Sequence, residues 1–191
     1  MLAYCSFWVN SRIVVVMQRH VAKPIVAILT GYTNLRDEII TLLQKNLGAA
    51  DYIGEWHSFR HTKYYEPEMG EELKRCLISF ETLISPDLLP KLKSWTREIE
   101  DHFRVNGKRN VNLDPGYVDY HKVVLASGKG GGHMIMLTPD VFVDMLLWYN
   151  KGWQFFPWAY PDFRDGTYFV DLNKIRNMLK SHYKPAAIGK I

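Results

Sequence analysis

The chain has 191 residues, 47% of them hydrophobic and 14% aromatic, so it can bury a full core as one domain without disulfides or a structural metal. Its 24 lysines and arginines face 20 acidic residues, and the net charge of +4 favours anionic partners but is too small to single out nucleic acid. The two cysteines, Cys5 and Cys76, lie far apart and outside any metal-ligand spacing, which indicates a reduced, cytoplasmic protein.

The N-terminal residues 1–16 are apolar only in short stretches, which Asn10, Ser11 and Arg12 interrupt, so they predict neither a transmembrane span nor a signal peptide. Either translation starts at Met17 rather than Met1, or residues 1–16 form a genuine edge strand. We expect an N-terminal extension at 1–22, a single domain at 23–183, a flexible tail at 184–191, and no membrane association.

The first half of the domain alternates strand and helix patterns. Residues 24–29 predict a buried strand, and turn residues then lead into a helix from Leu35 that Gly48 ends. Residues 52–59 predict a second strand and residues 73–84 a third, with Arg75 near the start of the third, where it could face a carboxylate or an anionic ligand. Pro86 begins a long helix with one apolar face.

Residues 61–70 are dense in groups that bind ligands or catalyse reactions. Pro67 argues against a regular helix here and favours an extended segment, in which Tyr64, Glu66 and Glu68 would share one face. Together with His61, the two carboxylates could bind a divalent cation or carry out acid–base chemistry. The alternative is a solvated loop whose tyrosines cover the edge of the core.

A second polar segment, residues 109–118, contains Asp114-Pro115-Gly116, which fits a type II turn. Such a turn would hold Asn112, Asp114 and Tyr117 close together, where they could orient a ligand. The alternative is that Asn112 and Asp114 only bond the local backbone.

The remaining chain predicts further strands and a last helix. A strand that starts at Lys122 is followed by a glycine-rich hairpin loop at 128–132, which lacks the features of a Walker-type nucleotide site. Residues 133–137 continue as a strand, residues 141–149 and 153–156 predict an antiparallel hairpin, residues 157–164 an aromatic connection, and a final helix starts near Tyr168.

Several blocks of the sequence resemble a prokaryotic family of unknown function whose members often carry the label "GTP-binding protein". The blocks are TKYYEPEMG from Thr62, NLDPGY from Asn112, and WAYPD from Trp158, which contains Asp162. The chain departs from the family pattern at Ser127 to Lys129 and at Met134, and Asp144 is the candidate replacement for a glutamate of its relatives. The resemblance implies one polar site built from these blocks and no established reaction.

These patterns together predict a single α+β domain with a mixed, mostly antiparallel sheet, helices from Leu35, Pro86 and Tyr168 packed mainly on one face, and a split β-α-β arrangement in the first half. Our first functional hypothesis is an enzyme or binder for a small anionic, nucleotide-like ligand. The candidate acid–base or cation-binding residues are His61, Glu66, Glu68, Asp114 and His133, and the candidate ligand-binding residues are Tyr64, Arg75, Arg109, Asn112, Tyr117, Lys122 and Asp162. The alternatives are an RNA-binding module, with aromatic residues that stack bases, and a structural partner in a complex.

Overall fold

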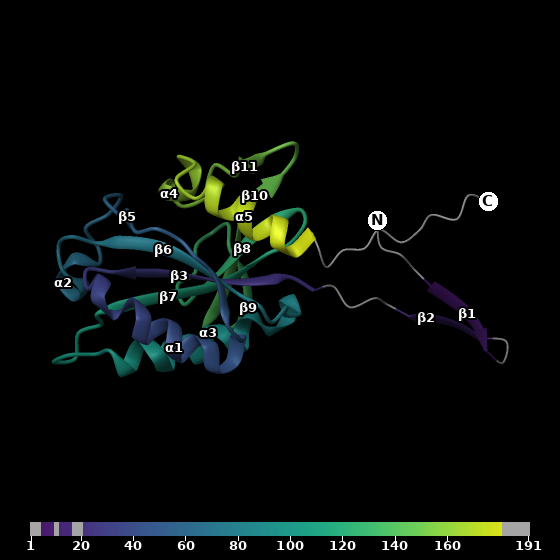
Figure 1. Ribbon diagram of the computed structural model, residues 1–191, viewed down its shortest axis with the longest axis horizontal. Coiled ribbons are helices and arrows are strands. Elements are labelled where there is room, and N and C mark those ends of the chain that lie inside the picture. The colour runs from purple at the N-terminus through teal and green to yellow at the C-terminus, as the bar shows by residue number, and fades with distance from the viewer. Residues whose placement is uncertain (1–4, 10–11, 17–20, 181–191) are drawn as a thin grey trace.

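The computed structural model describes residues 5–9, 12–16 and 21–180 (Figure 1). Strands β1 (Cys5–Val9) and β2 (Arg12–Val16) pair with each other as an antiparallel two-stranded sheet separate from the main sheet. Met17 and the predicted tail at 184–191 lie outside the described residues. The bounds of the predicted domain therefore stay a prediction.

The first half of the main sheet confirms the split β-α-β arrangement. Its strands are β3 (Lys23–Thr30), β4 (Ala50–Ile53), β6 (Lys74–Phe80) and β7 (Val111–Val118), in the order β4-β6-β3-β7. Because each neighbouring pair is antiparallel, β3 runs parallel to β4 across β6, and β6 runs parallel to β7 across β3. Helices α1 (Arg36–Leu47) and α3 (Leu89–His102) make these two connections, which gives the β-α-β-β-α-β order of ferredoxin-like folds.

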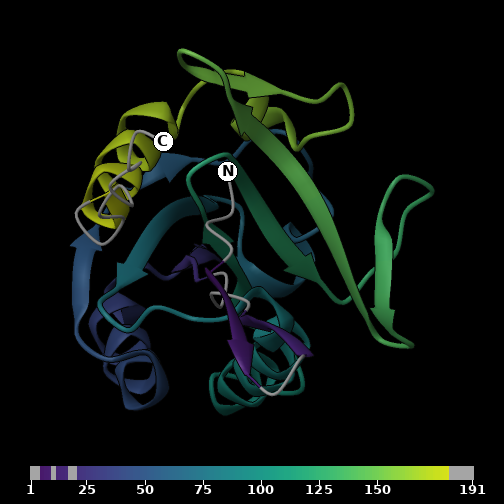
Figure 2. The ribbon, with the colours of Figure 1, turned by 90° about the vertical axis from the view of Figure 1, so that its right-hand side faces the viewer.

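Three further strands extend the sheet beyond β7. These are β8 (Lys122–Ser127), β10 (Val141–Tyr149) and β11 (Trp153–Phe155), and β9 (Ile135–Thr138) pairs with the first half of β10. Figure 2 shows β10 as a long strand with β9 at the outer edge of the sheet. The strand pairings of the main sheet among the described residues are all antiparallel, which agrees with the prediction of a mostly antiparallel sheet.

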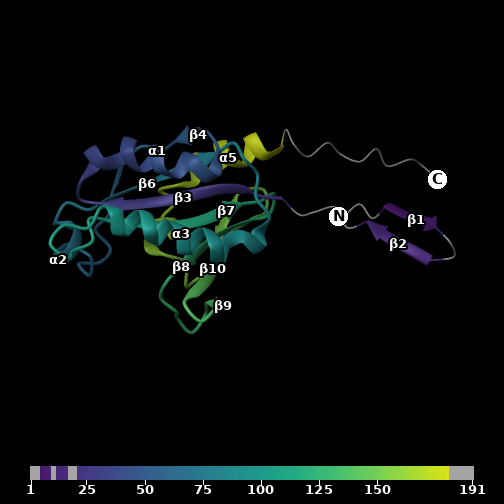
Figure 3. The ribbon, with the colours of Figure 1, turned by 90° about the horizontal axis from the view of Figure 1, so that it is seen from below.

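The helices cover both faces of the sheet. Short 3-10 turns, η1 (Thr33–Leu35) and η2 (Pro86–Leu88), lead into α1 and α3, which pack on one face with a shared apolar core (Figure 3). The last helix, α5 (Phe169–Lys180), buries Leu172 and Ile175 against the opposite face with Tyr168 and Phe163. Two of the three predicted helices therefore share a face, and the third covers the other one.

Two local predictions in the first half are wrong. Residues 52–59 do not form one strand, because the chain leaves β6 after Ile53 and returns only briefly as β5 (His57–Ser58). Residues 61–70 are not extended, since α2 (Glu66–Met69) forms with Pro67 in its first turn, where a missing N–H costs nothing. Glu66 and Glu68 are therefore not aligned on one face of an extended segment.

Two predictions in the second half also need correction. The connection at 157–164 contains a short helix, α4 (Pro161–Arg164), which the proline at its first position permits. The glycine-rich loop is not a hairpin, because β8 and β9 lie on opposite sides of β10. The loop therefore carries the chain past the end of β10.

The predicted type II turn at Asp114-Pro115-Gly116 is wrong, because β7 runs straight through it as a fully buried strand. Gly116 serves close packing rather than a turn, since a Cβ there would lie 2.2 Å from the backbone oxygen of Val124 on β8. Among the described glycines, the positive backbone angles lie elsewhere. Pro115, which also lies inside this strand, limits the pairing of β7 with β8.

Only residues Gly116 to Val118 of β7 pair with β8, and the preceding residues of β7 do not. Leu113 directs its backbone N–H and C=O away from β3, because both bond to side chains of α3. Pro115, two residues further along the strand, faces the same way and has no N–H to donate to β8. The ladder therefore ends at Pro115, and the first half of β7 is left without a strand neighbour on this side.

Candidate functional site

The opening between β7 and β8 contains a cavity of about 740 Å³, which we call the split-sheet cavity. It is lined by both strands, by α3, by the segment around α2, and by Tyr160 and Pro161. Its basic lining residues are Arg75, Lys93, Arg97, Arg104, Arg109 and Lys129, its acidic ones are Glu68, Glu100, Asp101 and Asp114, and its aromatic ones are Phe59, Tyr64, Tyr65 and Tyr160. Charged and aromatic side chains from segments distant in sequence thus meet at one place.

Two buried side chains of α3 replace the missing strand neighbour of β7. Glu100 Oε1 accepts the backbone N–H of Leu113 at 2.7 Å, and Lys93 Nζ donates to the Leu113 carbonyl at 2.6 Å. Lys93 Nζ also donates to Asp114 Oδ1 at 3.2 Å and to Glu100 Oε1 at 3.4 Å. An ammonium group has three donors, and all three are used here, so Lys93 is a structural cation rather than a free base.

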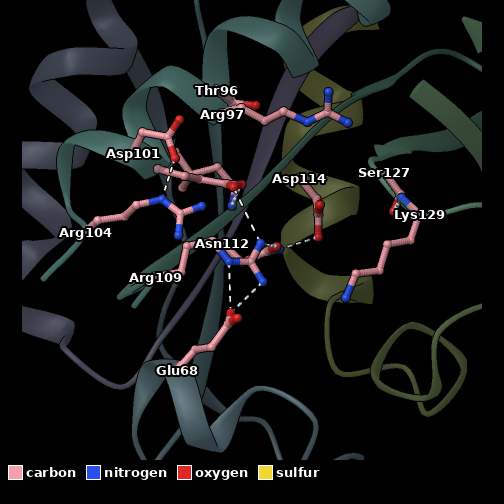
Figure 4. Close-up of polar contacts among 12 residues, drawn as sticks. Glu68, Thr96, Arg97, Asp101, Arg104, Arg109, Asn112, Asp114, Ser127 and Lys129 are labelled. Atoms are coloured by element: carbon pink, nitrogen blue, oxygen red, sulfur yellow. Dashed lines mark hydrogen bonds and ion pairs between the residues drawn. The ribbon is translucent and has the colours of Figure 1, made fainter. Parts of the chain in front are cut away.

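A chain of polar contacts continues from Asp114 along the cavity wall (Figure 4). Asn112 Nδ2 donates to Asp114 Oδ2 at 2.8 Å, and its amide oxygen accepts from Arg109 NH1 at 3.2 Å. Arg109 in turn donates from Nε and NH2 to Glu68 Oε2, at 3.1 and 3.0 Å. The amide and guanidinium thereby hold the two carboxylates apart at fixed positions, with Glu68 on the exposed side.

Arg75 lies at a buried end of the cavity. Its NH1 donates to Asp162 Oδ2 at 2.6 Å, the Tyr168 hydroxyl donates to the same oxygen at 3.0 Å, and the guanidinium lies 4.4 Å from the centre of the Phe59 ring. Burial alone would lower the pKa of Arg75, but Asp162 and Tyr168 outweigh it and raise that pKa. The Nε of Arg75 is buried and has no hydrogen-bond partner.

Two phenols, those of Tyr65 and Tyr160, line the cavity. Burial is the main reason why the pKa of Tyr65 is raised, and Asp114 adds to it. Burial and then Asp114 also raise the pKa of Tyr160, and the carboxylate of Asp144 contributes to this shift. Both hydroxyls therefore stay protonated at neutral pH and are available as hydrogen-bond donors.

The opposite wall is formed by the end of β8 and the glycine-rich loop (Figure 4). The ammonium of Lys129 lies 3.7 Å from the centre of the exposed Tyr64 ring and donates to the Tyr64 hydroxyl. Arg97 pairs with Asp140 at 2.5 Å and lies against Gly128, where a Cβ would approach its NH2 to 2.6 Å. Lys129 therefore joins this wall of the cavity to Tyr64, which precedes α2.

The cavity unites most of the predicted site residues. Its lining includes His61, Tyr64, Glu68, Arg75, Arg109, Asn112 and Asp114. Asp162 contacts Arg75 from behind, whereas Glu66 and His133 are outside the lining.

The predicted proximity of Tyr117 to Asn112 and Asp114 is wrong. Because side chains alternate along β7, Tyr117 packs into the core under α1 and α3, and burial raises its pKa to about 12. Lys122 pairs with Asp119 and lies over the Tyr117 ring.

Binding of a divalent cation by the candidate carboxylates stays a prediction. Among the residues that the structure describes, no three His, Cys, Asp or Glu side chains are grouped as metal ligands. Asp114 is tied to Lys93 and Asn112, and Glu68 to Arg109. The geometry therefore favours a site made of charge pairs over one made of carboxylates alone.

Sequence reasoning missed Lys93, Glu100, Tyr65 and Tyr160. Lys93 and Glu100 carried a usable signal, because both fall within the apolar face of the predicted helix, where a polar residue needs a partner. Tyr65 and Tyr160 lie in two of the family blocks, but neither was singled out, because aromatic residues in loops more often cover a core than line a site.

A domain of unknown function (DUF4416) matches residues 20–179 of the chain. No curated protein and no solved structure matches the chain. None of the helices in the described part of the chain is both long and apolar enough to span a bilayer. Since the match covers most of its length, the chain belongs to the DUF4416 family.

Proposed function

We propose that the split-sheet cavity binds a small anionic ligand. The observation that carries this proposal is the buried guanidinium of Arg75, which lines the cavity and keeps an Nε–H without an acceptor. A buried donor without a partner costs about 1–3 kcal/mol. A ligand oxygen that accepts this hydrogen bond recovers that cost, and a negative charge on the ligand strengthens the bond.

Charge in the cavity supports the same conclusion. Among the lining residues, the arginines and lysines outnumber the aspartates and glutamates by six to four. Lys129 is held by the phenol and ring of Tyr64, so its positive charge is not neutralised by that contact. An anion bound between Arg75 and Lys129 would meet positive charge on both sides.

The size and the remaining polar groups narrow the class of ligand. A cavity of about 740 Å³ falls within the range of roughly 300–1,000 Å³ typical of small-molecule sites. The Asp114 carboxylate accepts hydrogen bonds, whereas the Tyr65 and Tyr160 hydroxyls donate them. We therefore infer an anionic metabolite that also carries hydroxyl or amino groups, of up to nucleotide size, which the protein meets in the cytoplasm.

The experiment is a thermal-shift measurement with inorganic phosphate, pyrophosphate, nucleotides and phosphorylated metabolites, each with and without Mg²⁺. A ligand at about 100 times its dissociation constant stabilises the fold by about 2.7 kcal/mol, which raises the melting temperature by roughly 5–10 °C in a chain of this size. Lys129→Ala should remove most of this shift. Lys91→Ala, which removes an equal charge from an exposed position of α3 outside the cavity, should leave it unchanged.

A panel without any shift would contradict the proposal. Salt-sensitive binding of single-stranded RNA, measured in the same buffer, would then favour the RNA-binding alternative, because counterion release makes such binding fall steeply with salt. A stable partner in a pull-down without RNA or ligand binding would favour a structural role.

A further inference from the structure

His133, which lies outside the cavity lining, differs from the other histidines in its contact with a carboxylate. Four histidines in the described part of the chain lie near a carboxylate, with nitrogen–oxygen distances between 3.3 and 3.9 Å; they are His57, His61, His102 and His133. The pair of His133 with Asp144 is the shortest, at 3.3 Å from Nε2 to Oδ2. It alone of these four combines a half-exposed imidazole, 39% accessible, with a carboxylate that is 1% accessible.

Asp144 is an unusual residue for its position in β10. It pairs with Leu125 of β8 and is only 2% exposed. Its Oδ2 is buried and makes no fully formed hydrogen bond, although His133 Nε2 lies within reach of it. Burial raises the pKa of Asp144, while His133 and the Trp158 indole oppose that shift. A buried carboxylate without a fully formed hydrogen bond lowers stability unless a partner offsets the loss of hydration.

The imidazole of His133 is fixed on a second side by aromatic stacking. Its ring lies 6.0 Å from the Trp158 ring at an interplanar angle of 28°. Trp158 itself stacks on Phe156 at 4.9 Å and 14°. With Nε2 directed to Asp144 and one face covered, Nδ1 is the ring nitrogen left for another group.

His133 follows a loop whose first residues form part of one wall of the cavity. The loop that ends at His133 begins with Gly128 and Lys129, and both line the cavity. Trp158 precedes the cavity residue Tyr160 by two positions, and the charge of Asp144 reaches the Tyr160 phenol. The loop that carries Lys129 and the connection that carries Tyr160 therefore link the pair of His133 and Asp144 to the cavity wall.

We propose that His133 is a general base that accepts a proton from a water or hydroxyl group at the edge of the split-sheet cavity, and that Asp144 is its positioning residue. This proposal rests on the proposed function, because the substrate is the anionic ligand of the cavity. The proton moves to Nδ1, and the positive charge that this creates on the ring is stabilised by the buried carboxylate. Such contacts are often long in a ligand-free site and tighten when the substrate binds.

The test uses p-nitrophenyl acetate, a small activated ester, with the full chain. In the assayed step, His133 takes a proton from water while the water oxygen bonds to the acetyl carbon. The bond to p-nitrophenolate then breaks, acetate forms, and the protons pass to solvent. The variants are His133→Gln, Asp144→Asn and Asp144→Glu, and the matched control is His102→Gln, because His102 lies 3.5 Å from an exposed carboxylate, that of Glu38.

We expect His133→Gln and Asp144→Asn to lower the rate of ester cleavage about tenfold or more, the lower part of the range for general base catalysis. Asp144→Glu should restore part of the loss, and His102→Gln should leave the rate unchanged. Asp144→Asn should keep or raise the melting temperature, which separates loss of activity from unfolding.

Ester cleavage by the unmodified protein at the buffer rate, or cleavage that survives His133→Gln, would overturn the proposal. Equal rates for the unmodified protein and Asp144→Asn would remove the role of Asp144 as well. The thermal-shift measurement with phosphate tests anion binding independently of the ester assay. If ester cleavage depends on His133 but no anion raises the melting temperature, anion binding is contradicted and the role of His133 as a base is not.

Discussion

The contact of α3 with the open edge of β7 allows a sharp prediction for Lys93→Met. The ammonium is 4% exposed and holds the Leu113 carbonyl at 2.6 Å, Asp114 at 3.2 Å and Glu100 at 3.4 Å. Methionine fits the volume of the lysine stem but leaves a buried carbonyl without a donor and two carboxylates without their shared cation. Removing one partner of a buried ion pair costs about 3–5 kcal/mol.

That loss is large against a total stability of roughly 5–15 kcal/mol for a domain. It is measured by urea unfolding followed by tryptophan fluorescence, since the chain has six tryptophans. We expect the midpoint to fall with little change in the slope, which would identify a loss of stability in a native state of similar compactness. Lys91→Met, at an exposed position two residues earlier, should change the free energy of unfolding by less than about 0.5 kcal/mol.

A double-mutant cycle with Glu100→Gln completes the test. The glutamine keeps an acceptor for the Leu113 N–H but removes the negative charge that Lys93 faces. The double variant should therefore be less destabilised than the sum of the single ones, by about 0.5–3 kcal/mol. Equal costs for Lys93→Met and Lys91→Met, or strict additivity with Glu100→Gln, would refute a buried charge network as the link between α3 and β7.

Three further predictions concern single positions. Gly116→Ala should destabilise the fold by about 1–3 kcal/mol in the same urea assay, because its Cβ would meet the Val124 backbone oxygen at 2.2 Å; a neutral result would refute the close approach of β8. Asp144→Asn should stabilise the fold by on the order of 1 kcal/mol at pH 7.5, because burial raises the pKa of this carboxyl and its charged form is disfavoured. The gain should shrink as the pH is lowered and Asp144 becomes neutral. Burial would raise the pKa of Asp119, but hydrogen bonds from Lys122 and from the backbone N–H groups of residues 121 and 122 outweigh it and lower that pKa. Its stabilisation is therefore present above the unfolded pKa of about 3.9 and is lost as the pH falls through the lower folded value. An Asp119→Asn variant should lose stability at pH 7 and show a weaker pH dependence below about pH 4, measured by thermal unfolding across that range.

The failed prediction of a turn at Asp114-Pro115-Gly116 shows where local reasoning stops. Proline and glycine favour a type II turn, but they also occur in strands. In a strand, proline ends the hydrogen-bond ladder on one side, and glycine allows a neighbouring strand to approach closely. The strand is favoured only if β8 lies beside Gly116. The position of β8 depends on its pairing with β10, which lies outside this tripeptide and cannot be read from it. The same holds for Pro67, which is compatible with an extended segment and with the first turn of α2.

The residue pattern was enough to predict the α+β class, the positions of α1, α3 and α5, and most strands, because apolar periodicity and helix-ending glycines act over a few residues. Through the resemblance to a family pattern, the sequence also predicted that the blocks containing Glu68 and Asp114 belong to one site. Only the tertiary structure decided that β7 and β8 separate at Pro115, that Lys93 and Glu100 fill the gap, and that Asp144 lies buried behind His133. These arrangements bring together residues that are far apart in the chain. They could not be predicted because patterns of residue spacing describe only residues that are close in sequence.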